Sequence, residues 1–105
     1  MRDSRYCGRS SLQLDLHPEA VVEAREARLW YAERSPDVAA TFVGELDRAF
    51  ASIVEAPTRW PLKSGVRRYV MRRFPFLIVY RVFRSKLEII AVAHARRRPG
   101  YWKSR

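Results

Sequence analysis

Residues 76–95 read FLIVYRVFRSKLEIIAVAHA, and this stretch decides the fold. Its first part, residues 76–83, is nearly continuous apolar sequence, as expected of a central strand that is covered on both faces over most of its length. The second part, residues 86–95, is also largely apolar and predicts another strand. Only Arg84 and Ser85 separate the two. Because so short a link joins antiparallel neighbours, the stretch predicts a hairpin at the centre of an antiparallel sheet.

Two further strands are predicted outside this hairpin. Residues 66–73, VRRYVMRR, form a strand that the Pro75 signal separates from the central one. Residues 11–16, SLQLDL, alternate apolar and polar side chains with a period of two, which predicts a short strand with one apolar face. The short links between the last three strands imply an antiparallel meander. The sheet is therefore expected to have four strands.

Two helices are predicted between the first strand and the other three. The first spans about residues 18–34, and Pro18 suits its first position. The second spans about residues 37–55, with Ser35 as a capping residue and apolar side chains repeating at helical spacing. Since only a few residues link the two helices, they are expected to form an antiparallel hairpin.

The element order β-α-α-β-β-β predicts an α+β fold, in which a helical hairpin packs on one face of an antiparallel four-stranded sheet. A length of 105 residues suits one small domain. We expect residues 1–10 to be a flexible leader and residues 11–105 to form the domain. The chain has no apolar run typical of a secretory signal or a membrane span. With Cys7 as its single cysteine, it is expected in the reducing cytoplasm.

The charge of the chain is divided unevenly along its length. Residues 17–56 carry four Lys or Arg and eight Asp or Glu, a net charge of −4. Residues 63–105 carry thirteen Lys or Arg and the single acid Glu88, a net charge of +12. So strong a basic bias predicts an anionic partner for the C-terminal half, either nucleic acid or an acidic polypeptide.

The sequence predicts neither a metal site nor a cofactor. The histidines His17 and His94 lie far apart in the sequence, and no cysteine stands near either at ligand spacing. The four glycines are isolated, so no phosphate-binding loop is present. The acidic residues concentrate in the helices, away from the basic half.

Several arginines of the predicted strands are candidates for binding. Arg81 interrupts an apolar run, so its guanidinium must reach solvent, a ligand or a carboxylate such as that of Glu88. Arg67 and Arg68 must lie on opposite faces of their strand because they are consecutive, and the same holds for the pair that begins with Arg72. These arginines therefore do not form one continuous patch.

The stretch HARRRPGYW, residues 94–102, combines a histidine, three arginines and two aromatic residues. An RNA-cleaving site needs an acid, a base and cationic groups around the phosphate. The set His94, Arg81, Arg97 and Tyr101 supplies these residue types. A strand-end histidine hydrogen-bonded to backbone is the alternative, and we favour it. Pro99-Gly100 can turn the chain so that the two aromatic residues pack back or present an edge to a partner.

Several segments of the chain together resemble the RelE/ParE superfamily of bacterial toxins. They are HPEA and WYAERSP in the first helix and the turn after it, AATFVGELDRAFASIVEAP in the second helix, RYVMRRFPFLIVYRV in the strands, and VAHARRRPGYW at the end. The similarity covers about residues 11–105. It implies the toxin component of a type II toxin–antitoxin module of the plasmid stabilisation type. It also implies a cognate antitoxin with an acidic, partly disordered segment, which agrees with the basic half.

The superfamily has two activities. RelE-like members are ribosome-dependent mRNA endoribonucleases, whereas ParE-like members inhibit DNA gyrase by binding. Several of the nucleases place an arginine just before IVY in the central strand, where this chain has Leu77, and no glutamate stands in the two strands between residues 66 and 83. The resemblance therefore favours the ParE-like branch, a gyrase inhibitor without enzymatic activity. The ribonuclease remains the alternative, with the ribosome and mRNA as partners.

Under the favoured interpretation, basic and aromatic residues contact the target or the antitoxin. Trp30 and Tyr31 border a groove that could receive an antitoxin helix, although for Tyr31 we favour packing in the core. The predicted contact residues are Arg67, Arg72, Arg81, Arg96, Arg97, Arg98, Tyr101, Trp102 and Trp30.

Overall fold

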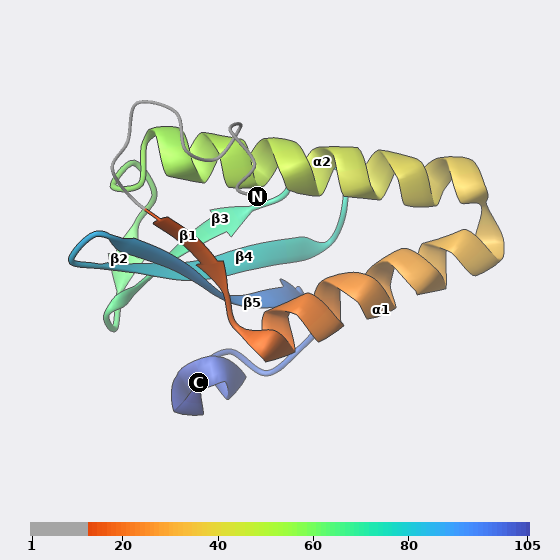
Figure 1. The fold of residues 1–105 in the computed structure, drawn as a ribbon. Helices are drawn as coiled ribbons and strands as arrows, with labels where there is room; N and C mark the ends of the chain where they lie inside the picture. Colours follow the sequence, from red (N-terminus) through yellow and green to blue (C-terminus); the bar gives the residue numbers. More distant parts are fainter. Residues whose placement is uncertain (1–12) are drawn as a thin grey trace.

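The computed structural model describes residues 13–105 (Figure 1). The elements follow the predicted order and confirm the α+β fold class. The leader predicted at residues 1–10 and the first two residues of the predicted first strand lie outside the described residues. The elements are β1 (Gln13–Leu16), α1 (Pro18–Arg34), α2 (Pro36–Glu55), β2 (Leu62–Lys63), β3 (Val66–Val70), β4 (Phe76–Phe83), β5 (Lys86–His94) and the 3₁₀ helix η2 (Tyr101–Ser104).

The sheet has five strands in the order β1-β5-β4-β3-β2. The predicted hairpin lies at its centre, where β4 and β5 pair antiparallel from Phe76 opposite His94 to Phe83 opposite Lys86. Figure 1 shows α1 and α2 running antiparallel over one side of this sheet, which confirms the helical hairpin. Contacts of α1 with β5 and of both helices with each other hold the hairpin in place.

The sheet differs from the prediction in two ways. β1 pairs parallel with β5, so the sheet is mixed rather than antiparallel throughout. The two strands are not joined directly, because both helices and three strands separate them in the sequence, and no short link dictates their direction. The fifth strand is β2, which has only two residues and shows no alternation pattern. Ser64 and Gly65, both at positive φ, form the two-residue turn that pairs β2 with β3.

Both helices begin where the sequence predicts, α2 at the predicted cap Ser35 and α1 at Pro18 with His17 as its cap. The Nδ1 atom of His17 accepts a hydrogen bond from the backbone N–H of Glu19, and Pro18 follows at the first helical position. The Oγ atom of Ser35 accepts from the backbone N–H of Val38 at the start of α2. These bonds satisfy N–H groups that have no partner within the helix.

Side chains pack on both faces of the sheet. Phe42 and Ile53 of α2 pack with Ile78 and Tyr80 of β4 in the core between the helices and the sheet. On the opposite face, Trp102 of η2 closes a smaller core.

A β-bulge in β5 serves this second core. Val79 lies opposite Ala91 while Tyr80 lies opposite Ile89, so Ile90 is the extra residue. Consequently both Ile90 and Ala91 belong to the same core as Trp102.

Two properties of the described residues bear on function. No helix within residues 13–105 is long and apolar enough to cross a membrane. In the same residues, no group of three or more His, Cys, Asp or Glu side chains could hold a metal ion.

Candidate functional site

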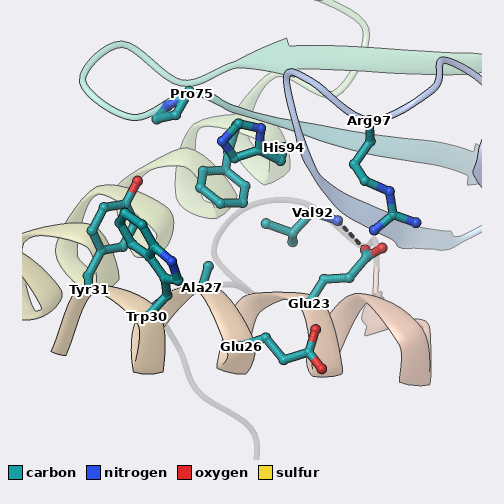
Figure 2. A pocket seen from close by; sticks show the side chains of 10 residues that line it. Glu23, Glu26, Ala27, Trp30, Tyr31, Pro75, Val92, His94 and Arg97 are labelled. Atoms are coloured by element: carbon teal, nitrogen blue, oxygen red, sulfur yellow. Dashed lines mark hydrogen bonds between the residues drawn. The ribbon is translucent and has the colours of Figure 1, made fainter. Parts of the chain in front are cut away.

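A groove of about 400 Å³ lies between α1 and the end of β5 (Figure 2). We call it the α1–β5 groove. Figure 2 shows one wall formed by side chains of α1 and the opposite wall formed by His94, Pro75 and Arg97. The lining residues are Glu23, Glu26, Ala27, Trp30, Tyr31, Pro75, Phe76, Val92, His94 and Arg97.

The groove exists because β1 covers only part of the edge of β5. The parallel pairing of the two strands runs from Lys86 to Ile89 and ends where the chain turns into α1. The backbone N–H of His17 donates the last bond, to the carbonyl oxygen of Ile89. Beyond that point, no strand within residues 13–105 neighbours the outer edge of β5. Helix α1 lies beside this edge instead, and its side chains must satisfy the exposed backbone groups.

Glu23 of α1 supplies the missing acceptor. Its Oε1 atom accepts a hydrogen bond of 3.0 Å from the backbone N–H of Val92, shown as the dashed line in Figure 2. A helix side chain thus replaces the carbonyl oxygen that a further strand would offer to β5.

The carboxylate of Glu23 also holds the C-terminal segment. The hydroxyl of Tyr101 donates to Oε2 at 2.5 Å, and the Nη1 and Nη2 atoms of Arg105 donate to Oε1 and Oε2, each at 3.0 Å. Nη1 of Arg105 also donates to the carbonyl oxygen of Ile90 on the same strand edge. The Glu23 and Arg105 side chains are only 11% and 13% exposed, so water screens this bidentate pair weakly.

These contacts fix the protonation of Tyr101. Burial first, and then the hydrogen bond to Glu23, raise the pKa of Tyr101 to about 12. The same Glu23 hydrogen bond raises the pKa of Arg105 above its ordinary value. At neutral pH the Tyr101 hydroxyl is therefore protonated, and it donates its hydrogen to the Glu23 carboxylate.

His94 and Arg97 form the opposite rim of the groove. The Nδ1 atom of His94 accepts a 3.0 Å hydrogen bond from the backbone N–H of Arg96, as the favoured interpretation of this histidine predicts. The ring of His94 lies edge-on to Phe76, with the centroids 5.1 Å apart. The guanidinium of Arg97 lies 4.0 Å from the centroid of the Tyr101 ring. At that distance the cation interacts with the face of the aromatic ring.

The two aromatic residues of α1 have different roles. Tyr31 packs against the rings of Phe42, Phe74 and Phe76, which confirms the predicted core position. Trp30 is 51% exposed and lines the groove. The guanidinium of Arg34 lies 3.5 Å from the centre of its ring and covers part of it.

The remaining predicted contact residues are dispersed. Arg72, Arg96 and Arg98 are exposed. Arg67 donates to the carbonyl oxygens of Thr58 and Trp60 and so ties the segment after α2 to β3. Trp102 is only 4% exposed, so its ring is not accessible to a partner in this arrangement. Of the two possibilities for the Pro99-Gly100 turn, the structure shows packing back.

The four residues considered for RNA cleavage do not come together. His94, Arg97 and Tyr101 lie near one another, but Arg81 is paired with Glu88 at 2.8 Å. On β4, Arg81 is five residues beyond Phe76, which lies opposite His94. At about 3.3 Å per residue, the separation along the strand is about 17 Å. One phosphate cannot contact both His94 and Arg81.

Sequence reasoning missed Glu23, although the helix pattern held a signal. Glu23 lies three residues after Ala20 and four before Ala27, and both alanines are buried. An acid beside the buried stripe of a helix needs partners on the neighbouring element. Phe76 and Val92 were assigned to strands, but nothing in the sequence indicated that they face a groove.

Comparison with known proteins identifies the family. Residues 14–99 match the family described as ParE toxin of type II toxin–antitoxin system, parDE. The chain belongs to the ParE toxin family. The matched residues include every groove residue, whereas Tyr101 and Arg105, which bind Glu23, lie beyond them.

A solved structure supports the fold of this ParE-family chain. The chain is similar to one described as the chromosomal ParDE TA system from P. aeruginosa, with a TM-score of 0.71 and 17% sequence identity. The alignment covers 80% of this chain and 96% of the other. Among curated protein sequences, no significant match is found.

The first prediction concerns the pH dependence that Tyr101 confers. Because its pKa rises from an ordinary value of 10 to about 12 on folding, Tyr101 contributes stability that is fully present below pH 10. This contribution is lost as the pH rises from about 10 to about 12. The difference in free energy of unfolding between the wild type and Tyr101→Phe should therefore be constant up to pH 10 and shrink above it.

Urea denaturation at a series of pH values measures this difference. Burial also raises the pKa values of Tyr31 and Tyr80. Both residues are present in the two proteins, so their contributions cancel in the difference. A difference that stays constant to pH 12 would show that Tyr101 titrates alike in the folded and unfolded chains, against the hydrogen bond to Glu23.

Proposed function

We propose that this ParE-family toxin inhibits DNA gyrase by binding to it and performs no covalent chemistry of its own. The observation that carries the proposal is the separation of about 17 Å between His94 and Arg81. Two further observations support it. The hydroxyl of Tyr101 is held by Glu23, and the Nδ1 atom of His94 is held by backbone. The basic half thus supplies contacts rather than an acid–base pair, and the proposed place of action is the cytoplasm.

Neutralisation by a cognate antitoxin is proposed at the α1–β5 groove. Its floor contains Ala27, Phe76 and Val92, which are buried apolar residues, while Trp30 offers an exposed aromatic surface. The exposed arginines 96–98 follow directly at the end of β5. An acidic, partly disordered segment that becomes ordered on binding can place apolar side chains in the groove and carboxylates near these arginines.

The choice between gyrase and mRNA is testable directly. The purified toxin should abolish DNA supercoiling by gyrase, because the proposal holds that binding of the toxin is enough to inhibit the enzyme. It should leave ribosome-bound mRNA intact. A supercoiling assay and a primer-extension assay on translating ribosomes, run with the same preparation, measure both activities. His94→Ala should retain inhibition within about threefold, since His94 has no catalytic part. Cleavage of mRNA with gyrase unaffected would establish the ribonuclease alternative.

Binding of the antitoxin in the α1–β5 groove leads to a separate prediction. Trp30→Ala should weaken binding of the cognate antitoxin at least about tenfold, as is typical for an interfacial tryptophan. Isothermal titration calorimetry measures the affinity. Leu29→Ala is the matched control because Leu29 is 46% exposed but is not part of the groove lining.

The two variants should have nearly the same unfolding midpoint, because both side chains are about half exposed. Equal affinities of the Trp30 and Leu29 variants would place the antitoxin elsewhere on the toxin.

A further inference from the structure

A second cavity, of about 380 Å³, lies between the β2–β3 turn and η2. We call it the cationic pocket. It shares no lining residue with the α1–β5 groove, and it includes Ile90 and Trp102 from the second core. Five basic residues line it, and the described lining contains no acid. The five are Lys63, Arg68, Arg81, Lys103 and Arg105.

Only two of these five charges are neutralised within the described chain. Arg81 pairs with Glu88, and Arg105 pairs with Glu23. No carboxylate within residues 13–105 lies within 4.0 Å of the cationic nitrogens of the other three, Lys63, Arg68 and Lys103. Positive charges gathered around one cavity repel one another, and an anion between them would offset that repulsion.

Arg68 is the most constrained of the three. Its guanidinium lies 5.5 Å from the centroid of the buried ring of Trp102. Among residues 13–105, its Nε is the buried side-chain polar atom that has no hydrogen-bond partner. A buried donor without an acceptor is costly, and such atoms are rare in proteins. The protein thus holds a partly buried, unpaired cation beside an open cavity.

The lysines are placed by two turns that require special backbone conformations. Lys63 precedes the turn in which Ser64 and Gly65 have φ values of 55° and 81°. Lys103 follows Gly100, whose φ is 83°. A Cβ atom on Gly100 would lie 2.9 Å from Cε of Lys103, so the lysine side chain lies directly against this glycine. The backbone therefore fixes the ends of the cavity from which both lysines extend.

We propose that the cationic pocket binds a phosphate group of a nucleic-acid backbone. The three unpaired cations match a phosphodiester and its flanking oxygens, which Lys and Arg recognise without reading the base sequence. An acidic peptide fits this pocket less well than it fits the α1–β5 groove. The largest apolar side chains of the lining, Ile90 and Trp102, are 2% and 4% exposed and offer no anchor. The pocket goes beyond the proposed function because it concerns contact with nucleic acid, whichever target the toxin has.

The test compares two variants that lose the same charge. Lys63→Gln/Lys103→Gln removes two cations from the pocket, and Arg96→Gln/Arg98→Gln removes two exposed cations outside it. Fluorescence anisotropy with a labelled DNA duplex of arbitrary sequence measures affinity for the full chain at several salt concentrations. The pocket variant should bind at least about tenfold more weakly and show a less steep salt dependence, whereas the control should change by less than about threefold.

Further measurements distinguish a phosphate site in the pocket from diffuse charge and from a carboxylate site. All four replaced side chains are exposed, so thermal unfolding should confirm that both variants fold. In the wild type, the duplex should shift the amide NMR signals of Gly65 and Gly100, a readout that does not depend on any variant. If both variants lost the same affinity for the duplex, the DNA would be bound by the general surface charge and not by the cationic pocket. That result would overturn the proposal. A hexaglutamate peptide that shifts the two glycines while the duplex does not would overturn it in favour of a carboxylate site.

Discussion

The rest of the functional surface depends on the hydrogen bonds that the carboxylate of Glu23 accepts. It accepts hydrogen bonds from the backbone of β5, from Tyr101 and from Arg105, and so joins α1, the sheet edge and the C-terminal segment. The need for such a group follows from topology. Because β1 leaves β5 after Ile89, the remaining edge has backbone groups that no strand of the described chain covers. A single acid on the adjacent helix satisfies Val92 and neutralises Arg105, which in turn bonds to Ile90.

This constraint separates two surfaces of different character. On the α1 side, it leaves a groove with an apolar floor, which Glu26 and Arg97 also line and where the antitoxin segment is proposed to bind. On the other side, Trp102 closes the second core, and Arg105 lines the cationic pocket while it is bonded to Glu23. The stretch HARRRPGYW therefore has several structural roles. His94 and Arg97 form a rim, Tyr101 is a partly buried donor, and Trp102 is a core residue.

The sequence could predict those parts of the fold that rest on local patterns. The apolar run of β4, the cap at Ser35, Pro18 at the start of α1, and the two helices each have a signature within a few residues, and each was found. The parallel pairing of β1 and the two-residue strand β2 were missed because they depend on contacts that no local pattern encodes. The pairing of Arg81 with Glu88 was foreseen as one alternative, since both residues were placed on neighbouring strands.

The candidate site was less predictable, because it is assembled from residues far apart in sequence. Charge counting identified the basic half but not which arginines are neutralised. The composition of HARRRPGYW indicated an exposed binding edge, whereas Trp102 is buried. The β-bulge at Ile90, which places two consecutive residues in the core of Trp102, has no sequence signature of its own.

Amide hydrogen exchange of Glu23→Ala tests the central role of this carboxylate most directly, with Glu26→Ala as a matched control on the same helix. The account predicts that Glu23→Ala speeds exchange of the Val92 amide, and of the Lys103 and Arg105 amides that bond within the C-terminal segment, by at least about tenfold. Glu26→Ala should leave all three unchanged. Equal exchange rates in the two variants would contradict the account, because the sheet edge and the C-terminal segment would then be held without Glu23.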